Sequence, residues 1–113
     1  MSYPGCVRCD GNLPPIVCIC GSTRFASRMN ELAEEETLEG RIVVRPEVVA
    51  YSSGNDPQLQ RPEVKAKLDE LHLRKIDLAD EVLVVAVDGY IGESTRREIA
   101  YAESLGKRLR YSG

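Results

Sequence analysis

The sequence predicts an α/β protein in which a small parallel β-sheet is covered by helices on both faces. Short apolar runs rich in β-branched residues alternate along the chain with segments whose apolar residues recur every three or four positions. The runs are continuously apolar, which is typical of strands buried on both faces. The connections between the runs are long enough to be crossovers, and crossovers join parallel strands.

Two short runs supply the first half of the predicted sheet. A strand is expected over 16–20, followed by an amphipathic helix over 24–39 that Gly40 ends. A second strand is expected over 41–45, at an edge of the sheet, because Pro46 lacks the amide that a central strand needs. The acidic residues of the first helix are interpreted as a solvent-exposed face: Glu31, Glu34, Glu35, Glu36 and Glu39.

The second half of the chain repeats the alternation after a polar stretch at 52–61, which is expected to be a surface loop. A helix is predicted over 62–79, a strongly apolar central strand over 81–87, a third helix over 95–105 and a last strand over 107–111. The inward side of the second helix is predicted to carry Val64, Leu68, Leu71 and Ile76.

These elements predict a short, flavodoxin-like α/β/α sandwich of three layers, with four parallel strands in the order 2-1-3-4. Residues 1–15 are expected to be an irregular lead-in, and 16–113 a single domain. In such a sheet the strand order reverses between the first and third strands. Ligands bind beyond the carboxyl ends of the strands at this switch point.

Composition excludes several classes of protein. The 113 residues carry 15 basic and 18 acidic side chains, and the net charge of -3 has the wrong sign for binding nucleic-acid phosphates. No apolar run approaches the roughly 18 residues that span a bilayer. We therefore expect a cytoplasmic protein that binds neither a nucleic acid polymer nor a membrane.

The four cysteines come as two close pairs, Cys6 with Cys9 and Cys18 with Cys20. Structural zinc sites usually draw on two knuckles in loops, whereas the second pair lies inside an apolar run. Two positions apart on a strand, Cys18 and Cys20 share one face and are interpreted as small core residues. We expect no metal and no cofactor, with zinc at the cysteines as the alternative.

The turn after the first strand is one candidate binding segment. Gly21, Ser22, Thr23 and Arg24 combine a flexible backbone, two hydroxyls and a guanidinium, which suit a phosphate or a sugar hydroxyl. An ordinary turn followed by a helix N-cap explains the same residues, so the sequence leaves both interpretations open.

The segment after the central strand is the second candidate, and it is the densest cluster of reactive side chains in the chain. Thr95 and Glu98 have the spacing of a capping box, in which the Glu98 side chain folds back on the start of its helix. A site residue and a capping residue are equally compatible with that spacing. The candidate site residues here are Asp88, Ser94, Thr95, Arg96 and Glu98.

The chain resembles the nucleoside 2-deoxyribosyltransferase-like family, which includes nucleoside deoxyribosyltransferases and nucleoside 5'-monophosphate N-glycosidases. The similarity rests on 19–22 (ICGS), 79–85 (ADEVLVV), 98–102 (EIAYA) and the Gly-Lys at 106–107. The resemblance implies that Glu98 is a nucleophile that attacks the anomeric carbon and expels the nucleobase. Water or a second base then resolves the covalent ribosyl intermediate.

One position departs from the family pattern. The family has an Asp two helical turns before the central strand, and this chain has His72, its single histidine, at that position. His72 is assigned a catalytic role if it faces the cleft, and a buried helix-face residue is the other interpretation. Asp69 and Asp77 are the possible substitutes. The hydroxyls and the guanidinium before Glu98 favour a 5'-phosphate on the ligand.

The resemblance thus implies an enzyme whose partner is a small nucleoside or nucleotide. A non-catalytic nucleotide-binding module on the same fold is the alternative, motivated by His72 in place of the Asp. A third hypothesis is an interaction protein in which Glu98 only caps its helix. A homodimer is expected because Ile99, Tyr101 and Ala102 give the last helix an apolar face for a partner.

Overall fold

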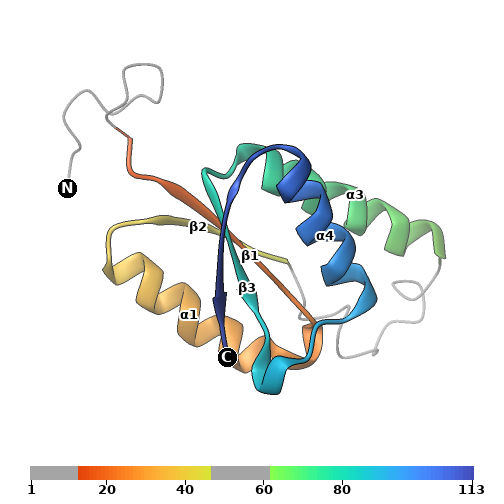
Figure 1. The fold of residues 1–113 in the computed structure, drawn as a ribbon, viewed down its shortest axis with the longest axis horizontal. Helices are drawn as coiled ribbons and strands as arrows, with labels where there is room; N and C mark the ends of the chain where they lie inside the picture. The colour runs from red at the N-terminus through yellow and green to blue at the C-terminus, as the bar shows by residue number, and fades with distance from the viewer. Residues whose placement is uncertain (1–12, 47–61) are drawn as a thin grey trace.

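The computed structural model describes residues 13–46 and 62–113 (Figure 1). Most of the predicted lead-in at 1–15 and the predicted loop at 52–61 lie outside these residues, and so does the first cysteine pair. No helix in the described part of the chain is long and apolar enough to cross a membrane.

The described residues form one fully parallel sheet with the strand order β2-β1-β3-β4, which confirms the predicted topology. β1 (Ile16–Gly21) and β3 (Glu81–Val85) are the central strands. β2 (Ile42–Val44) lies at one edge, as the proline after it predicts, and β4 (Arg108–Ser112) lies at the other. The strand order reverses between β1 and β3.

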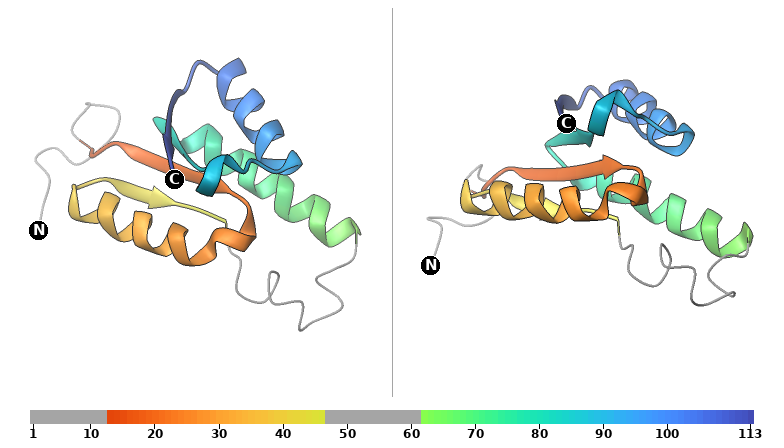
Figure 2. Two further views of the ribbon diagram at one scale, coloured as in Figure 1. Left: turned by 60° about the horizontal axis from the view of Figure 1, so that its bottom comes forward. Right: turned by 90° about the horizontal axis from the view of Figure 1, so that it is seen from below.

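Helices cover both faces of the sheet. The short 3-10 helix η2 (Thr23–Phe25) leads into α1 (Ala26–Leu38), which packs on one face, whereas α3 (Pro62–Leu78) and α4 (Glu93–Ser104) pack on the other (Figure 1). The two further views in Figure 2 show the same separation. A second 3-10 helix, η4 (Val87–Gly89), follows β3, so the central strand ends earlier than predicted.

Alternation along β1 divides the core in two. Val17 and Ile19 point toward α1 and pack with Met29 and Leu32. Cys18 and Cys20 point toward α3 and α4, in the cluster that contains Ile76 and Ala102. Both cysteines are fully buried, which confirms that they share one face of the strand.

The predicted inward side of α3 is correct for Ile76, which is fully buried, and wrong for Leu71, which is 50% exposed. His72 takes the buried position beside it. Leu71 instead lines a cavity beyond the sheet. The apolar pattern counts histidine as a polar residue, so it assigned the buried position to Leu71 and not to His72. Part of α3 also extends beyond the sheet, where an apolar side chain has no strand to pack against (Figure 1).

One acidic residue of α1 is buried, contrary to the prediction. Glu36 is 7% exposed and accepts hydrogen bonds from Arg110 of β4, the shorter at 2.6 Å, and Arg41 lies 3.3 Å from the same carboxylate. Nε of Arg110 also donates to Glu81 across 2.9 Å. We call these four residues the Arg110 cluster. Helix periodicity counts Glu36 as a polar surface residue, but the guanidiniums that neutralise it come from elsewhere in the chain.

The face of α4 that the sequence offered to a second subunit is used within the chain. Ala102 is fully buried, and Ile99 and Tyr101 pack against the same core cluster. These contacts bury Ala102 and partly cover Ile99 and Tyr101, so the homodimer stays a prediction with less support from this face.

Candidate active site

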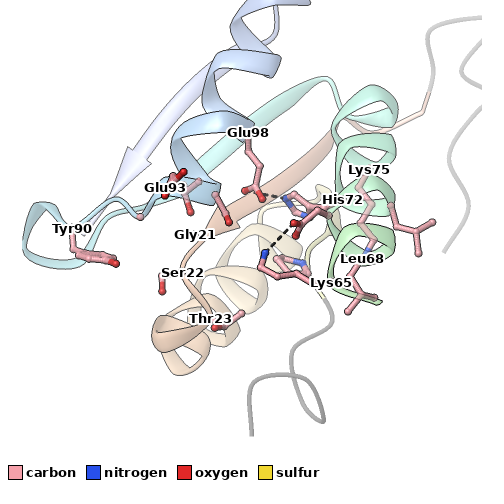
Figure 3. A pocket seen from close by; sticks show the side chains of 16 residues that line it. Gly21, Ser22, Thr23, Lys65, Leu68, His72, Lys75, Tyr90, Glu93 and Glu98 are labelled. Carbon is pink, nitrogen blue, oxygen red and sulfur yellow. Dashed lines mark hydrogen bonds and ion pairs between the residues drawn. The ribbon is translucent and has the colours of Figure 1, made fainter. Parts of the chain in front are cut away.

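A cavity of about 440 Å³ opens at the carboxyl ends of β1 and β3, at the predicted switch point (Figure 3). Its walls come from the turn after β1, the loop after β3, and one side each of α3 and α4. Small-molecule sites typically have volumes of about 300–1,000 Å³. The predicted site residues that line it are Gly21, Ser22, Thr23, His72, Ser94, Thr95 and Glu98.

Glu98 points from α4 into this cavity, toward His72 of α3 (Figure 3). Its Oε1 lies 3.6 Å from Nε2 of His72, and its side chain is 16% exposed. Burial raises the pKa of Glu98, and the facing charge of His72 acts in the opposite direction. A largely desolvated carboxylate therefore stands where a ligand can reach it, which is typical of functional sites.

The capping box, one of the two interpretations that the spacing of Thr95 and Glu98 left open, does not form at the start of α4. The helix begins at Glu93, with Gly92 as the N-cap in an extended conformation and no side-chain hydrogen bond at the cap. Thr95 is therefore inside the first turn, and Glu98 lies one turn further along. Residues 93–98 are all polar, so apolar periodicity does not reveal that the helix begins at Glu93. Because Glu98 does not cap the helix, its side chain can face the cavity.

His72 is 5% exposed and lies between α3 and β1. Its Nε2 is 3.2 Å from Sγ of Cys20 and 3.9 Å from Sγ of Cys18. Its Nδ1 is buried and has no hydrogen-bond partner among the described residues. Burial acts to lower the pKa of His72, but the hydrogen bond and charge of Cys18, together with the charge of Glu98, outweigh burial and raise the pKa.

The two buried thiols titrate as a pair. A hydrogen bond from Cys20 lowers the pKa of Cys18 to about 6, and His72 acts in the same direction against burial. The same hydrogen bond and burial raise the pKa of Cys20 well above its ordinary value. Both sulfurs face the same imidazole nitrogen, so these pKa shifts belong to the pair and not to either thiol alone.

The turn after β1 is both an N-cap and a wall of the cavity. The Ser22 hydroxyl accepts a hydrogen bond from the Arg24 amide across 3.3 Å and caps η2. Ser22 and Thr23 also line the cavity. The Arg24 guanidinium lies 4.0 Å from the centre of the Tyr90 ring, and Arg24 itself is outside the lining. Gly21 is packed so closely that an added Cβ would lie 3.0 Å from Cβ of Val85.

Two further predicted site residues, although in the described part of the chain, lie outside the cavity lining. Asp88 is an exposed residue of η4 with a φ of 54°. Arg96 donates through Nε to the Ile91 carbonyl across 3.3 Å. Asp77, a possible substitute for the family Asp, accepts a hydrogen bond from the Tyr101 hydroxyl and is also outside the lining.

Several residues that line the cavity were not predicted from the sequence as site residues. Asp69, named only as a possible substitute, lines the cavity and accepts a hydrogen bond from Lys65 across 2.9 Å. Lys75 also lines it and donates to the Arg45 carbonyl across 2.6 Å. Tyr90 belongs to the segment after β3 that the sequence singled out, but an aromatic residue in a loop has no periodicity to mark it.

Comparison with protein-family models and with curated proteins finds no match to this chain.

Proposed function

We propose that the protein cleaves or exchanges the N-glycosidic bond of a nucleoside or a nucleoside 5'-monophosphate, with Glu98 as the nucleophile. The observation that carries this proposal is the Glu98 carboxylate, directed into a ligand-sized cavity at the switch point of the sheet. The resemblance of 19–22, 79–85 and 98–102 to the nucleoside 2-deoxyribosyltransferase-like family supplies the reaction class.

The reaction has two steps. An oxygen of Glu98 forms a bond to the anomeric carbon, the bond from that carbon to the base nitrogen breaks, and its electron pair leaves with the base, which takes a proton from solvent. Water then adds to the anomeric carbon, its proton passes to solvent, and the bond to Glu98 breaks to release the carboxylate and the free sugar. A second base that adds in place of water gives exchange.

His72 fits a positioning role better than the acid role that its place in the sequence suggests. In retaining glycosidases the nucleophile and the acid stand about 5–5.5 Å apart, on opposite faces of the sugar. Only 3.6 Å separates Nε2 of His72 from the Glu98 carboxylate, so both groups lie on the nucleophile's side. Burial raises the pKa of Glu98, and a positive charge on His72 partly offsets that effect in favour of the ionised form that attacks.

Other lining residues supply contacts for the rest of the ligand. Ser22, Thr23 and Asp69 offer hydroxyl and carboxylate partners for sugar hydroxyls. Ser94 and Thr95, in the first turn of α4, offer hydroxyls at the end of the helix that favours a 5'-phosphate. In a bound nucleoside or nucleoside monophosphate, these polar residues would contact the sugar and the phosphate, and the base would lie near the loop after β3.

The test is release of free base, measured chromatographically, from the common ribo- and deoxyribonucleosides and their 5'-monophosphates, with and without an acceptor base. Wild type and Glu93→Gln are expected to release base, and Glu98→Gln is not. Glu93 is the matched control because it lies on the same helix and lines the same cavity, but is exposed.

Unchanged base release by Glu98→Gln would overturn the assignment of the nucleophile. Tight nucleotide binding by calorimetry, with no release from any substrate in the panel, would replace the proposal with a non-catalytic nucleotide-binding module.

A further inference from the structure

Three side chains able to bind a metal converge behind the cavity. Cys18 and Cys20 of β1 meet His72 of α3, and their ligand atoms all lie within 4.8 Å of one another. All three side chains are buried. Glu98 is a neighbouring carboxylate outside this group: its Oε1 lies 3.6 Å from the same Nε2 of His72 that faces both sulfurs.

Hydrogen bonding explains only part of this convergence. An imidazole nitrogen carries either one hydrogen or one lone pair, so it satisfies one partner well. Two sulfurs and a carboxylate oxygen surround Nε2 of His72, whereas its buried Nδ1 has no hydrogen-bond partner in the described part of the chain.

The distances match the edges of a zinc tetrahedron. Zinc–sulfur bonds of about 2.3 Å and zinc–nitrogen or zinc–oxygen bonds of about 2.0–2.1 Å place sulfur about 3.6 Å from nitrogen, and oxygen about 3.3–3.4 Å from nitrogen. The sulfurs of Cys20 and Cys18 lie 3.2 and 3.9 Å from Nε2 of His72, on either side of the ideal value. The Glu98 oxygen lies 3.6 Å from Nε2 of His72 but outside the group whose ligand atoms are all within 4.8 Å of one another, so the carboxylate must turn toward the sulfurs to complete a tetrahedron.

We propose that Cys18, Cys20 and His72 bind one Zn²⁺, with the Glu98 carboxylate as the fourth ligand. Two sulfurs, one imidazole and one carboxylate form a mixed donor set that suits zinc, whereas magnesium and calcium require oxygen ligands. Binding displaces the proton of each thiol that is still protonated. Glu98 and His72 line the cavity, whereas both cysteines are fully buried behind it, so an ion would enter past these two side chains.

Cysteine spacing alone misses this site. The spacing of Cys18 and Cys20 does not match that of zinc knuckles in loops, and the third ligand, His72, lies 52 residues beyond Cys20 on a helix. A disulfide is the weaker use of the same pair. Residues two apart on a strand have Cα atoms about 6.6 Å apart, near the upper limit for a disulfide.

Zinc binding has a consequence that rests on the proposed function. A Glu98 carboxylate that coordinates zinc has no free oxygen directed at the anomeric carbon. Equimolar zinc is therefore expected to lower base release at least tenfold, and a chelator is expected to restore it. Metal binding itself needs no catalytic activity, so the two claims fail separately.

The experiment is a titration of chelator-treated, reduced protein with Co²⁺, which replaces zinc and reports its ligands by absorption. The decisive protein is the Cys6→Ser/Cys9→Ser variant, because its only remaining cysteines are Cys18 and Cys20. We expect thiolate-to-cobalt charge-transfer bands and the strong visible bands of a tetrahedral site, saturating at one equivalent and abolished by one equivalent of Zn²⁺.

Two further variants locate the remaining ligands. Glu98→Gln is expected to keep the charge-transfer bands while its visible bands shift, because an amide or a water replaces the carboxylate. Cys18→Ser/Cys20→Ser, checked for folding by circular dichroism, is expected to lose the bands. Absence of charge-transfer bands in Cys6→Ser/Cys9→Ser would overturn the site, and an unshifted visible spectrum in Glu98→Gln would remove Glu98 from it.

Discussion

Two buried carboxylate clusters lie on opposite faces of this sheet and are neutralised in different ways. In the Arg110 cluster, on the α1 face, two guanidiniums contact Glu36 and Glu81. In the cavity, on the α3 and α4 face, Glu98 faces one histidine and a pair of thiols. No guanidinium contacts Glu98 among the residues that the structure describes.

The difference separates stability from chemistry. A carboxylate held by guanidiniums has its charge neutralised and its lone pairs occupied, so it fixes the helix α1 against the strands β3 and β4. A carboxylate beside an imidazole, at the wall of a cavity, keeps an oxygen available to a ligand and has a raised pKa. Replacing a charged residue with a neutral one should therefore abolish activity but not stability in the cavity, and should lower stability but not activity in the Arg110 cluster.

The largest expected effect is on catalysis. Glu98→Gln is expected to lower kcat/KM for base release by at least about 10³-fold, because the amide cannot form the covalent intermediate. Its folding stability at neutral pH, measured by denaturant unfolding of chelator-treated protein, should equal or exceed that of wild type. The raised pKa means that the ionised carboxylate destabilises the folded state above that pKa, and a neutral amide removes this cost. A folded variant that releases base normally would break the comparison.

The reverse pattern is expected at the Arg110 cluster. Arg110→Met leaves Glu36 and Glu81 with Arg41 alone, and we expect a loss of about 2–3 kcal/mol in unfolding free energy. This value is below that for a fully buried pair because the Arg110 side chain is 35% exposed. Base release per folded molecule should be unchanged.

Charge repair sharpens this result. Adding Glu36→Gln and Glu81→Gln to Arg110→Met should restore much of the lost stability, because no unpaired carboxylate stays buried. A triple variant as unstable as Arg110→Met would show that packing of the Arg110 side chain, and not its charge, stabilises this face.

Gly21→Ala should affect both properties, since Gly21 joins the sheet to the cavity. The added Cβ would approach Cβ and the carbonyl of Val85 at 3.0 and 3.3 Å, so β1 and β3 must separate slightly. We expect a loss of about 1–3 kcal/mol by thermal or denaturant unfolding, as for other overpacked sites. Base release should fall with it, and an unaffected Tm would show that this end of the sheet yields easily.

The sequence predicted the strand order because continuous apolar runs and long crossovers constrain a parallel sheet strongly. It misplaced Leu71 and Glu36, whose burial depends on partners from other elements. Periodicity describes one helix at a time, so it assigns a glutamate to the surface even where Arg110 of a distant strand neutralises it.

The site was predictable in part. The switch-point rule brought Ser22 and Glu98 to one cavity, because the rule depends only on strand order. The meeting of His72 with Cys18 and Cys20 was not predictable, since it depends on which side of α3 faces β1. The sequence does show a single histidine and two cysteines on one face of a strand. The way α3 packs against β1, which the sequence does not reveal, is what brings these three side chains together.

The smallest expected effect is at the turn after β1. Ser22→Ala removes the hydroxyl that accepts from the Arg24 amide at the start of η2. We expect a loss of about 0.5–1 kcal/mol in unfolding free energy, as for other N-caps. If Ser22 also binds the sugar or a phosphate, KM rises while kcat is unchanged, whereas a residue that only caps the helix leaves both constants unchanged.

The most direct test of the central claim is to trap the sugar on the protein. A nucleoside with fluorine at the 2-position of the sugar and a good leaving base slows the breakdown of the covalent intermediate, because fluorine destabilises an oxocarbenium-like transition state. Mass spectrometry of the digested protein is expected to show one fluorosugar on the peptide carrying Glu98, and none in Glu98→Gln. A fluorosugar on any other side chain of the wild-type protein would contradict the assignment of Glu98 as the nucleophile.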